Sequence, residues 1–252
     1  MPANGADHPP LTPGRAAVGI TLTAVGGYVD CFGYLTLSQV YTAQMSGNTV
    51  LIAVHAGSGD IASALLHAYT IGVFLFGLLV SGVGIEAALR CNIRRVLALA
   101  LIIEVVCLAA LALWGAPLIG GNAIGTADHP RWTLYALIAL TAAAMGLQNT
   151  SLRMAGILAV FTTHVTGSLT QASEWLILFL LPRTGVKRRP ALAQAAFSAS
   201  LWLSFFLGAL LVSELQPRQA PGLVLLLPIS ALLAVIAADL MRPLANPKKA
   251  PA

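Results

Sequence analysis

Six apolar segments constrain what this chain can fold into more than any other feature of the sequence. A helix needs about 20 mainly apolar residues to cross the hydrocarbon core of a bilayer. Most of the segments reach that length, and the shortest, the fourth, is expected to extend at one of its ends. The six segments are residues 16–37, 65–89, 96–114, 133–147, 192–212 and 223–241. They predict an all-α integral membrane protein with about six transmembrane helices.

The composition excludes a water-soluble domain. Hydrophobic residues make up 58% of the 252 residues and charged residues only 9%, whereas a soluble domain carries roughly 25% charged residues. The lipid bilayer is therefore an expected partner. The net charge of +5 comes from short basic clusters beside apolar segments, without interleaved aromatic residues, so nucleic acid is not an expected partner. Cys31, Cys91 and Cys107 lack Cys-x-x-Cys spacing, and neither a metal site nor a cofactor is predicted.

Two further stretches, residues 44–54 and 158–181, are apolar but interrupted. A polar segment with a central glycine lies in or beside each of them: residues 41–49 (YTAQMSGNT) and residues 162–170 (TTHVTGSLT). Both segments are too polar for a lipid-facing helix. We interpret the two stretches as re-entrant segments that enter and leave the membrane on the same side, and a full crossing stays open as the alternative.

The distribution of Arg and Lys favours six crossings over eight, because cytoplasmic loops collect these residues. With six crossings and a cytoplasmic N-terminus, only Arg131 and Arg218 fall outside. The basic residues on the cytoplasmic side are then Arg15, Arg90, Arg94, Arg95, Arg153, Arg183, Lys187, Arg188, Arg189, Arg242, Lys248 and Lys249. With eight crossings, the clusters at 90–95 and 183–189 would lie on opposite faces. We therefore predict that both termini are cytoplasmic.

The two halves of the chain repeat the same features in the same order. Gly27 and Gly146 precede the two polar segments with an offset of 119, and the central glycines of those segments are offset by 120. The sequence FLFGLL at 74–79 then matches FFLGAL at 205–210 with an offset of 131. Three crossings per half would make the second half inverted relative to the first, an arrangement typical of secondary transporters. The predicted inverted repeats cover residues 16–115 and 131–242.

These repeats form a single predicted transmembrane domain, residues 16–242. The flanking residues 1–15 and 243–252 are rich in Pro, Ala, Gly and polar residues and are expected to be disordered tails.

The polar segments supply most of the candidate residues for binding a substrate or an ion. A glycine permits the backbone to leave the helix, and hydroxyl and amide side chains can cap the next helix or face a ligand. The free N–H groups of such a helix would favour an anion or a carbonyl oxygen. The candidates are Ser46, Gly47, Asn48, Thr49, Thr163, His164, Thr166, Gly167 and Ser168. The alternative is that both segments are plain turns without a ligand.

Two carboxylates lie inside apolar segments, where a charge is expensive unless it is paired or hydrated. Asp30 lies near the middle of the first segment and Glu104 near the middle of the third. Each is a candidate for coupling transport to a proton or a cation, and each could instead form a hydrogen bond between helices. The region equivalent to Asp30 in the second half holds Gln148 and Asn149, which complete the candidate site.

The ordered set of motifs resembles the YoaK-like family of bacterial inner-membrane proteins, whose function is not established. The motifs are Gly27-Tyr28-Val29-Asp30 with Gly33, Met45-Ser46-Gly47-Asn48-Thr49, Gly146-Leu147-Gln148-Asn149, and Thr162-Thr163 with Val165-Thr166-Gly167-Ser168-Leu169-Thr170. Ser46 and Ser168 replace the threonine expected there, and Cys31 replaces alanine; these changes are mild. The resemblance implies a multi-spanning protein of the bacterial inner membrane, and it supplies no substrate.

The leading functional hypothesis is a small secondary transporter or permease for an unidentified small solute or ion. The alternative is a membrane scaffold or sensor that does not transport. An enzyme is not expected, because the chain lacks His-Glu-x-x-His, Gly-x-Ser-x-Gly and paired aspartates on adjacent segments. Ser230, Ala234 and Ala238 recur every four residues and permit close helix contact, either within the bundle or in a homo-oligomer.

Overall fold

The computed structural model describes residues 12–91, 93, 95–120, 132–154, 165–181 and 188–242, and this part of the chain contains helices and no strands. The expected disordered C-terminal tail and the polar residues Thr163 and His164 lie outside the described residues. The helices are α1 (Pro13–Thr36), α2 (Met45–Gly57), α3 (Ile61–Arg90), α4 (Val96–Ala110), the π-helical turn η1 (Leu111–Gly115), α5 (Ala116–Gly120), α6 (Trp132–Met154), α7 (Val165–Leu180), α8 (Arg188–Leu215) and α9 (Pro221–Met241).

The all-α membrane fold expected from the sequence is confirmed. Five helices are long and apolar enough to cross a membrane: α1, α3, α4 continued by η1, α8 and α9. Helix α6 is long enough at 23 residues but is not among them. Its C-terminal half carries Gln148, Asn149 and Arg153, which lower its hydropathy. The count of six crossings therefore stays a prediction.

Helix α1 begins at Pro13, within residues that the sequence assigns to the N-terminal tail. The side chain of Thr12 accepts a hydrogen bond from the backbone N–H of Arg15 at 3.4 Å, and Pro13 occupies the first helical position, where its missing N–H carries no penalty. This ordinary capping signal places the start of the helix three residues before the apolar segment.

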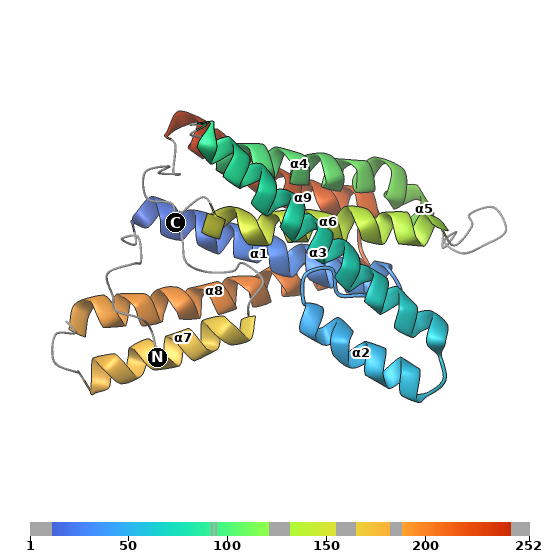
Figure 1. Ribbon diagram of the computed structural model, residues 1–252, viewed down its shortest axis with the longest axis horizontal. Helices are drawn as coiled ribbons and strands as arrows, with labels where there is room; N and C mark the ends of the chain where they lie inside the picture. Colours follow the sequence, from blue (N-terminus) through green and yellow to red (C-terminus); the bar gives the residue numbers. More distant parts are fainter. Residues whose placement is uncertain are drawn as a thin grey trace.

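Helices α2 and α7 are shorter than the five candidate membrane spans and run away from the middle of the molecule in opposite directions (Figure 1). At 1.5 Å per residue their 13 and 16 residues extend roughly 20 and 24 Å, less than the roughly 30 Å of a hydrocarbon core. The end on the left of Figure 1 holds the starts of α1, α4 and α8 and the ends of α3 and α7, and the opposite end holds the α2–α3 connection.

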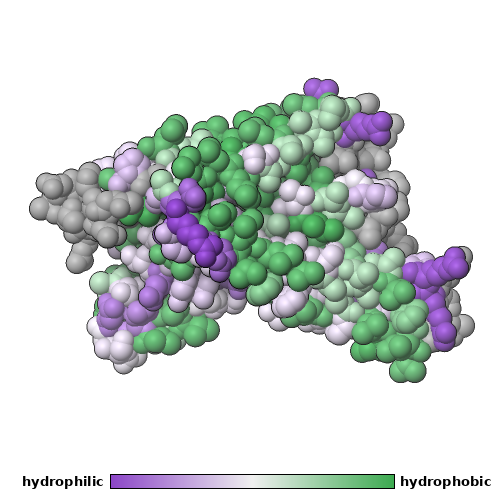
Figure 2. Space-filling view, turned by 180° about the vertical axis from the view of Figure 1, so that it is seen from behind, coloured by the Kyte–Doolittle hydropathy of each residue, from purple (hydrophilic) through white to green (hydrophobic). Residues whose placement is uncertain are grey.

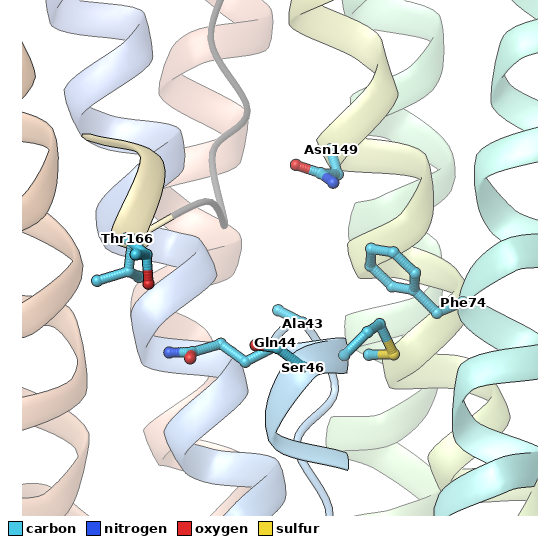
Figure 3. Close-up of a pocket in the computed structure, with 8 residues that line it drawn as sticks. Ala43, Gln44, Ser46, Phe74, Asn149 and Thr166 are labelled. Atoms are coloured by element: carbon cyan, nitrogen blue, oxygen red, sulfur yellow. The ribbon is translucent and has the colours of Figure 1, made fainter. Parts of the chain in front are cut away.

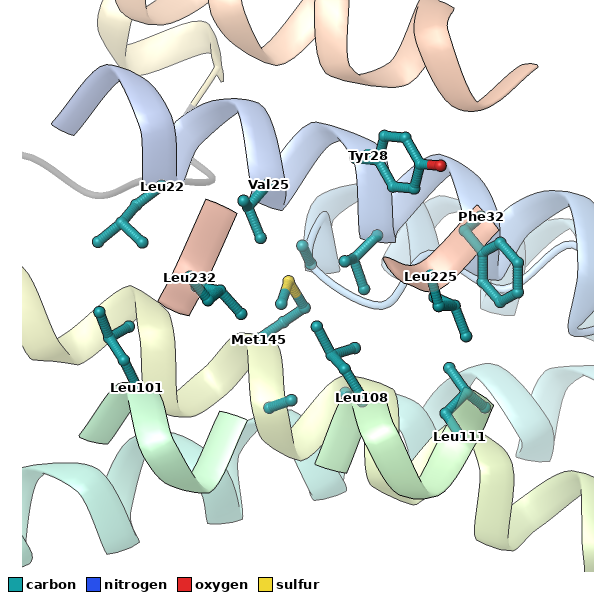
Figure 4. Close-up of a cluster of buried hydrophobic side chains, with 14 of the residues drawn as sticks. Leu22, Val25, Tyr28, Phe32, Leu101, Leu108, Leu111, Met145, Leu225 and Leu232 are labelled. Atoms are coloured by element: carbon teal, nitrogen blue, oxygen red, sulfur yellow. The ribbon is translucent and has the colours of Figure 1, made fainter. Parts of the chain in front are cut away.

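The apolar core lies where α1, α4, α6 and α9 meet. Leu22, Leu108, Met145 and Leu225, one from each helix, are fully buried there and belong to the cluster of side chains in Figure 4. The hydroxyl of Tyr28 donates a hydrogen bond to the carbonyl oxygen of Val224 at 2.7 Å, which fastens α1 to α9. Outside this core the surface is broadly apolar across its middle (Figure 2), as expected for helices that face lipid.

Two helix crossings show the same reciprocal contacts between glycines and carbonyl groups. Where α1 crosses α8, a Cβ at Gly27 would overlap the carbonyl oxygen of Phe205, and a Cβ at Gly208 would overlap that of Ala24. Small residues at such a position let two helix backbones approach closely.

The crossing of α3 with α6 repeats this geometry. A Cβ at Gly146 would overlap the carbonyl oxygen of Phe74, and a Cβ at Gly77 would overlap that of Ala143. These residues are related to those of the first crossing by the offsets found in the sequence, 119 for Gly27 and Gly146 and 131 for Gly77 and Gly208. Each crossing therefore joins one helix from each half of the chain.

Candidate functional site

Asp30 organises the connection between α1 and α2. Its carboxylate is buried in α1, and Oδ1 accepts hydrogen bonds from the backbone N–H groups of Ala43 at 2.6 Å and Gln44 at 3.2 Å. These N–H groups directly precede α2, whose N-cap residue Gln44 forms no capping hydrogen bond of its own. A carboxylate that accepts backbone N–H groups at a helix start is stabilised by the helix dipole. Asp30 thus fixes where α2 begins.

Asn48, predicted as a ligand-binding residue, holds the same connection from the other side. Its Oδ1 accepts from the backbone N–H of Tyr41 at 3.1 Å, and its Nδ2 donates to the carbonyl oxygen of Tyr41 at 2.6 Å. Oδ1 also lies 3.1 Å from Nδ1 of His67 on α3. Because Asn48 is fully buried and all these partners belong to the protein, it acts as a structural clamp.

Gly47 allows the ring of Tyr41 to lie directly against the first turn of α2. A Cβ at Gly47 would lie 2.8 Å from Cδ2 of that ring. The ring of Tyr34 stacks on that of Tyr41, with the two centroids 4.8 Å apart. The absence of a side chain at Gly47 therefore lets the Tyr41 ring pack closely against the backbone of α2.

A cavity of about 370 Å³ lies between the N-terminal ends of α2 and α7. Its lining comes from both polar segments together with one residue each of α3 and α6. The lining residues are Ala43, Gln44, Met45, Ser46, Phe74, Asn149, Val165 and Thr166. In Figure 3 the side chain of Gln44 extends toward Thr166, and Asn149 approaches the same space from α6. Two segments roughly 120 residues apart in sequence thus meet at one cavity.

Within the described part of the chain, the residues that line this cavity carry amide, hydroxyl, thioether and apolar groups, and none of them is charged. Its electrostatic character comes from the starts of α2 and α7, since the first N–H groups of a helix lack intrahelical partners and carry the positive end of the dipole. Among the described residues, nothing accepts a hydrogen bond from the N–H groups of Met45 or Ser46. The cavity therefore favours negative charge or a carbonyl oxygen.

Gln148 and Asn149 are adjacent on α6 but differ in their environment. Nε2 of Gln148 donates to the carbonyl oxygen of Leu22 at 2.6 Å, which ties α6 to α1. Asn149 lines the cavity, is only 9% exposed, and its buried Oδ1 has no hydrogen-bond partner among the described residues. Oε1 of Gln148 also lacks a hydrogen-bond partner among the described residues, but of the two predicted amides only Asn149 lines the cavity.

The remaining predicted residues divide between the cavity and other places. Ser46 and Thr166 line the cavity. Thr49 is exposed and donates to the carbonyl oxygen of Met45 at 2.9 Å. Ser168 is buried in α7, and neither it nor Gly167 belongs to the lining.

Glu104 lies away from the cavity, on the buried face of α4. Neither of its carboxyl oxygens has a hydrogen-bond partner among the described residues. The structure therefore does not bring the two candidate coupling carboxylates into one site.

Five lining residues were not predicted as site residues. Three of them, Ala43, Gln44 and Met45, belong to the first polar segment, and Val165 belongs to the second, so their position beside Ser46 and Thr166 was the available signal. Phe74 comes from α3, and only the packing of α3 against α6 brings it to the cavity. No pattern in the sequence indicates that contact.

The connection between α2 and α3 holds a second aspartate at a helix start. Asp60 caps α3 by accepting from the N–H of Ser63 at 3.1 Å, and its Oδ2 lies 3.5 Å from Nδ1 of His55. Hydrogen bonds from the side chain and backbone of Ser63 lower the pKa of Asp60, and His55 adds a smaller effect. Among the described residues, no group of three His, Cys, Asp or Glu side chains could hold a metal ion.

A comparison with known sequences shows the family to which this chain belongs. The pattern of a family described as "Protein of unknown function (DUF1275)" matches residues 18–238, nearly the whole membrane domain. The chain belongs to the DUF1275 family. One curated relative is the "UPF0700 transmembrane protein YoaK" of Bacillus subtilis (strain 168), which is 24% identical over 196 residues, covering 78% of this chain and 81% of that protein.

The resemblance expected from the motifs is thereby confirmed, and this DUF1275 protein is a multi-pass membrane protein. No solved structure matches the chain. The cavity between α2 and α7 lies within the region shared with the DUF1275 family, since all its lining residues fall between positions 18 and 238.

Proposed function

We propose that this DUF1275 protein is a small secondary transporter that binds a small solute or ion in the cavity between α2 and α7. The observation that carries the proposal is the shared lining: Ser46 and Thr166 are 120 residues apart in sequence and line one cavity of about 370 Å³. Secondary transporters form their substrate sites where broken helices from two repeats meet near the membrane midplane.

The matched glycine crossings support an inverted repeat of three plus three crossings, with α2 and α7 re-entrant. In this arrangement α1, α3 and α4 of the first half correspond to α6, α8 and α9 of the second. The pseudo-symmetry then maps the α1–α8 crossing onto the α3–α6 crossing. This agrees with the close approach of glycines to backbone carbonyl groups at both crossings. Helix α6 is the sixth crossing, and its polar part contacts α1 and α3: Gln148 donates to the carbonyl oxygen of Leu22, and Ser81 donates to that of Leu147.

The positions of the basic residues support cytoplasmic termini in a bacterial inner membrane. Arg15 belongs to the start of α1, Arg90 and Arg95 flank the α3–α4 connection, and Arg188 begins α8, all at the left end of Figure 1. Arg218 lies between α8 and α9. The end rich in arginine is the cytoplasmic one by the positive-inside rule.

Asp30 couples transport to a proton or a cation in this proposal. Its Oδ1 holds the N–H groups of Ala43 and Gln44, and both of these residues line the cavity. A change in the charge of Asp30 alters those two hydrogen bonds and so the wall of the cavity. Glu104 remains a second candidate, since a buried carboxylate without a partner is costly in a membrane.

Transport by purified protein tests the proposal. The protein is reconstituted in liposomes and presented with a panel of small anions, cations and neutral metabolites, with and without a pH gradient. We expect uptake of at least one solute, and loss of its dependence on the pH gradient in Asp30→Asn, which keeps Oδ1 as an acceptor. Absence of transport and of ligand-induced stabilisation across the panel would refute the proposal.

Topology is tested separately by labelling single cysteines with an impermeant maleimide. Cys91 is exposed beside the α3–α4 connection and serves as a native reporter once Cys31 and Cys107 are replaced by serine. We expect Cys91 and Arg188→Cys to react from one side and Ser58→Cys from the other. Reaction of Cys91 and Arg188→Cys from opposite sides would exclude the inverted repeat.

A further inference from the structure

We propose that the cavity between α2 and α7 binds a small monovalent carboxylate that also carries a neutral hydrogen-bond donor, such as a short 2-hydroxy acid. The inference names the substrate class of the proposed transport site, and its transport step rests on that function. Binding itself is measured independently of transport.

The two helix starts supply the attraction for a negative charge. Helices α2 and α7 begin at the cavity from opposite directions, so the positive ends of both dipoles lie beside it (Figure 1). At α2, Asp30 already accepts from the N–H groups of Ala43 and Gln44, whereas those of Met45 and Ser46 have no acceptor among the described residues. A carboxylate in the cavity would provide that acceptor.

Asn149 supplies an independent indication of a ligand. Its side chain is more than nine-tenths buried, and in Figure 3 it projects into the space that Gln44 and Thr166 also border. Its Oδ1 has no hydrogen-bond partner among the described residues, and a buried acceptor without a donor is costly. A ligand with an O–H or N–H group would satisfy this oxygen.

The neutral lining restricts the charge and the size of the ligand. A cation would find no carboxylate among the described lining residues, and Asp30 is 2% exposed with its Oδ1 already bonded to backbone N–H groups. A divalent anion would find no Lys or Arg among these lining residues to neutralise its second charge. A volume of about 370 Å³ holds only a small molecule. Together these features select a small monovalent acid.

Matched ligands test the charge and the donor separately. Lactate and propionate differ in the hydroxyl, glycolate and acetate repeat that comparison, and lactamide replaces the carboxylate of lactate by a neutral amide. Binding to the full chain in detergent is measured by calorimetry and by the shift of the thermal midpoint. We expect each hydroxy acid to bind about tenfold more tightly than its deoxy partner, and lactate at least tenfold more tightly than lactamide.

Two variants of Asn149 connect these preferences to the cavity. Asn149→Ala should bring lactate and propionate to equal affinity, because the oxygen that distinguishes them is gone. Asn149→Asp should abolish binding of both acids by placing a negative charge in the lining. Thr150→Val, at the next position of α6 and outside the lining, should leave the wild-type preference unchanged, and unaltered thermal midpoints of the ligand-free variants show that each is folded.

The outcomes separate the two proposals. Equal binding of lactate and lactamide, no preference for hydroxy acids over deoxy acids, or no binding of any of these acids at tens of millimolar would overturn the carboxylate inference. Transport of a neutral or cationic solute would then still support a transporter. Binding of hydroxy acids without transport in liposomes would refute the transporter and leave the binding site in place.

Discussion

Asp30 and Asn149 occupy equivalent positions in the two halves of the chain and do different work. They are 119 residues apart, the same offset that relates Gly27 to Gly146. Asp30 is engaged with the backbone at the start of α2, whereas Oδ1 of Asn149 is unpartnered at the cavity. The residue at this position thus holds a helix start in the first half, whereas the equivalent residue in the second half has an oxygen without a hydrogen-bond partner. A repeated fold need not repeat the role of each residue.

The largest loss of stability is expected at Asp30, and only a small one at Asn149. Asp30→Ala leaves two buried N–H groups without an acceptor and should lower the free energy of unfolding by about 2–5 kcal/mol. Asn149→Ala removes an oxygen that has no partner and should change that free energy by less than about 1 kcal/mol. Thermal unfolding in detergent measures both. Equal losses would mean that Asn149 is also structural.

The glycine crossings test how closely the two halves match. Gly27→Ala and Gly146→Ala each drive a Cβ into a backbone carbonyl group of the partner helix, and each should destabilise the protein by about 2–3 kcal/mol. The control is Gly72→Ala in α3, where a Cβ meets no atom within 4 Å. It should be neutral or stabilise by up to about 1 kcal/mol. A large loss of stability at only one of the two crossings would show that the crossings are not equivalent.

A smaller effect is expected at Gly47, which belongs to the Asp30 side of the comparison. In Gly47→Ala the new Cβ displaces the ring of Tyr41, a side chain that can shift, so a loss of about 1–2 kcal/mol is expected. Gly57→Ala, at the far end of the same helix, meets no atom within 4 Å and serves as the control. Because alanine favours a helix more than glycine does, Gly57→Ala should not lower the thermal midpoint. An equal lowering by both substitutions would show that the contact with Tyr41 is not the cause of the loss.

The smallest effect concerns Asp60, an exposed counterpart of Asp30 at the start of α3. Its pKa is lowered in the folded protein by the hydrogen bonds from Ser63. Its contribution to stability is therefore present above its ordinary pKa of about 3.9 and is lost as the pH falls through the lower folded value. The difference in thermal midpoint between wild type and Asp60→Asn should shrink as the pH is lowered from 5 to 3. A constant difference would exclude this linkage.

Local sequence patterns predict the helices and the two polar segments, because apolar length and interrupting polar residues are local properties. The role of Asn48 is not local: its amide matches the backbone groups of Tyr41 only after the chain has turned between α1 and α2. Sequence reasoning also missed Asp239 near the end of α9, which accepts from the N–H of Ala98 at 3.2 Å. The two residues are 141 positions apart, and only the packing of α4 on α9 brings them together.

The two glycine crossings cannot form at the same time during synthesis of the chain. Gly77 and Gly146 are 69 positions apart, whereas Gly27 and Gly208 are 181 apart. At roughly 5–20 residues per second, α3 waits roughly 3–14 s for its partner and α1 waits roughly 9–36 s. Helix α1, which is synthesised before the other described helices, is therefore among the last of them to be packed. During that interval the glycine face of α1 lacks its partner helix, and Asp30 lies one turn beyond Gly27. This face must then be covered by lipid, the insertion machinery or a chaperone.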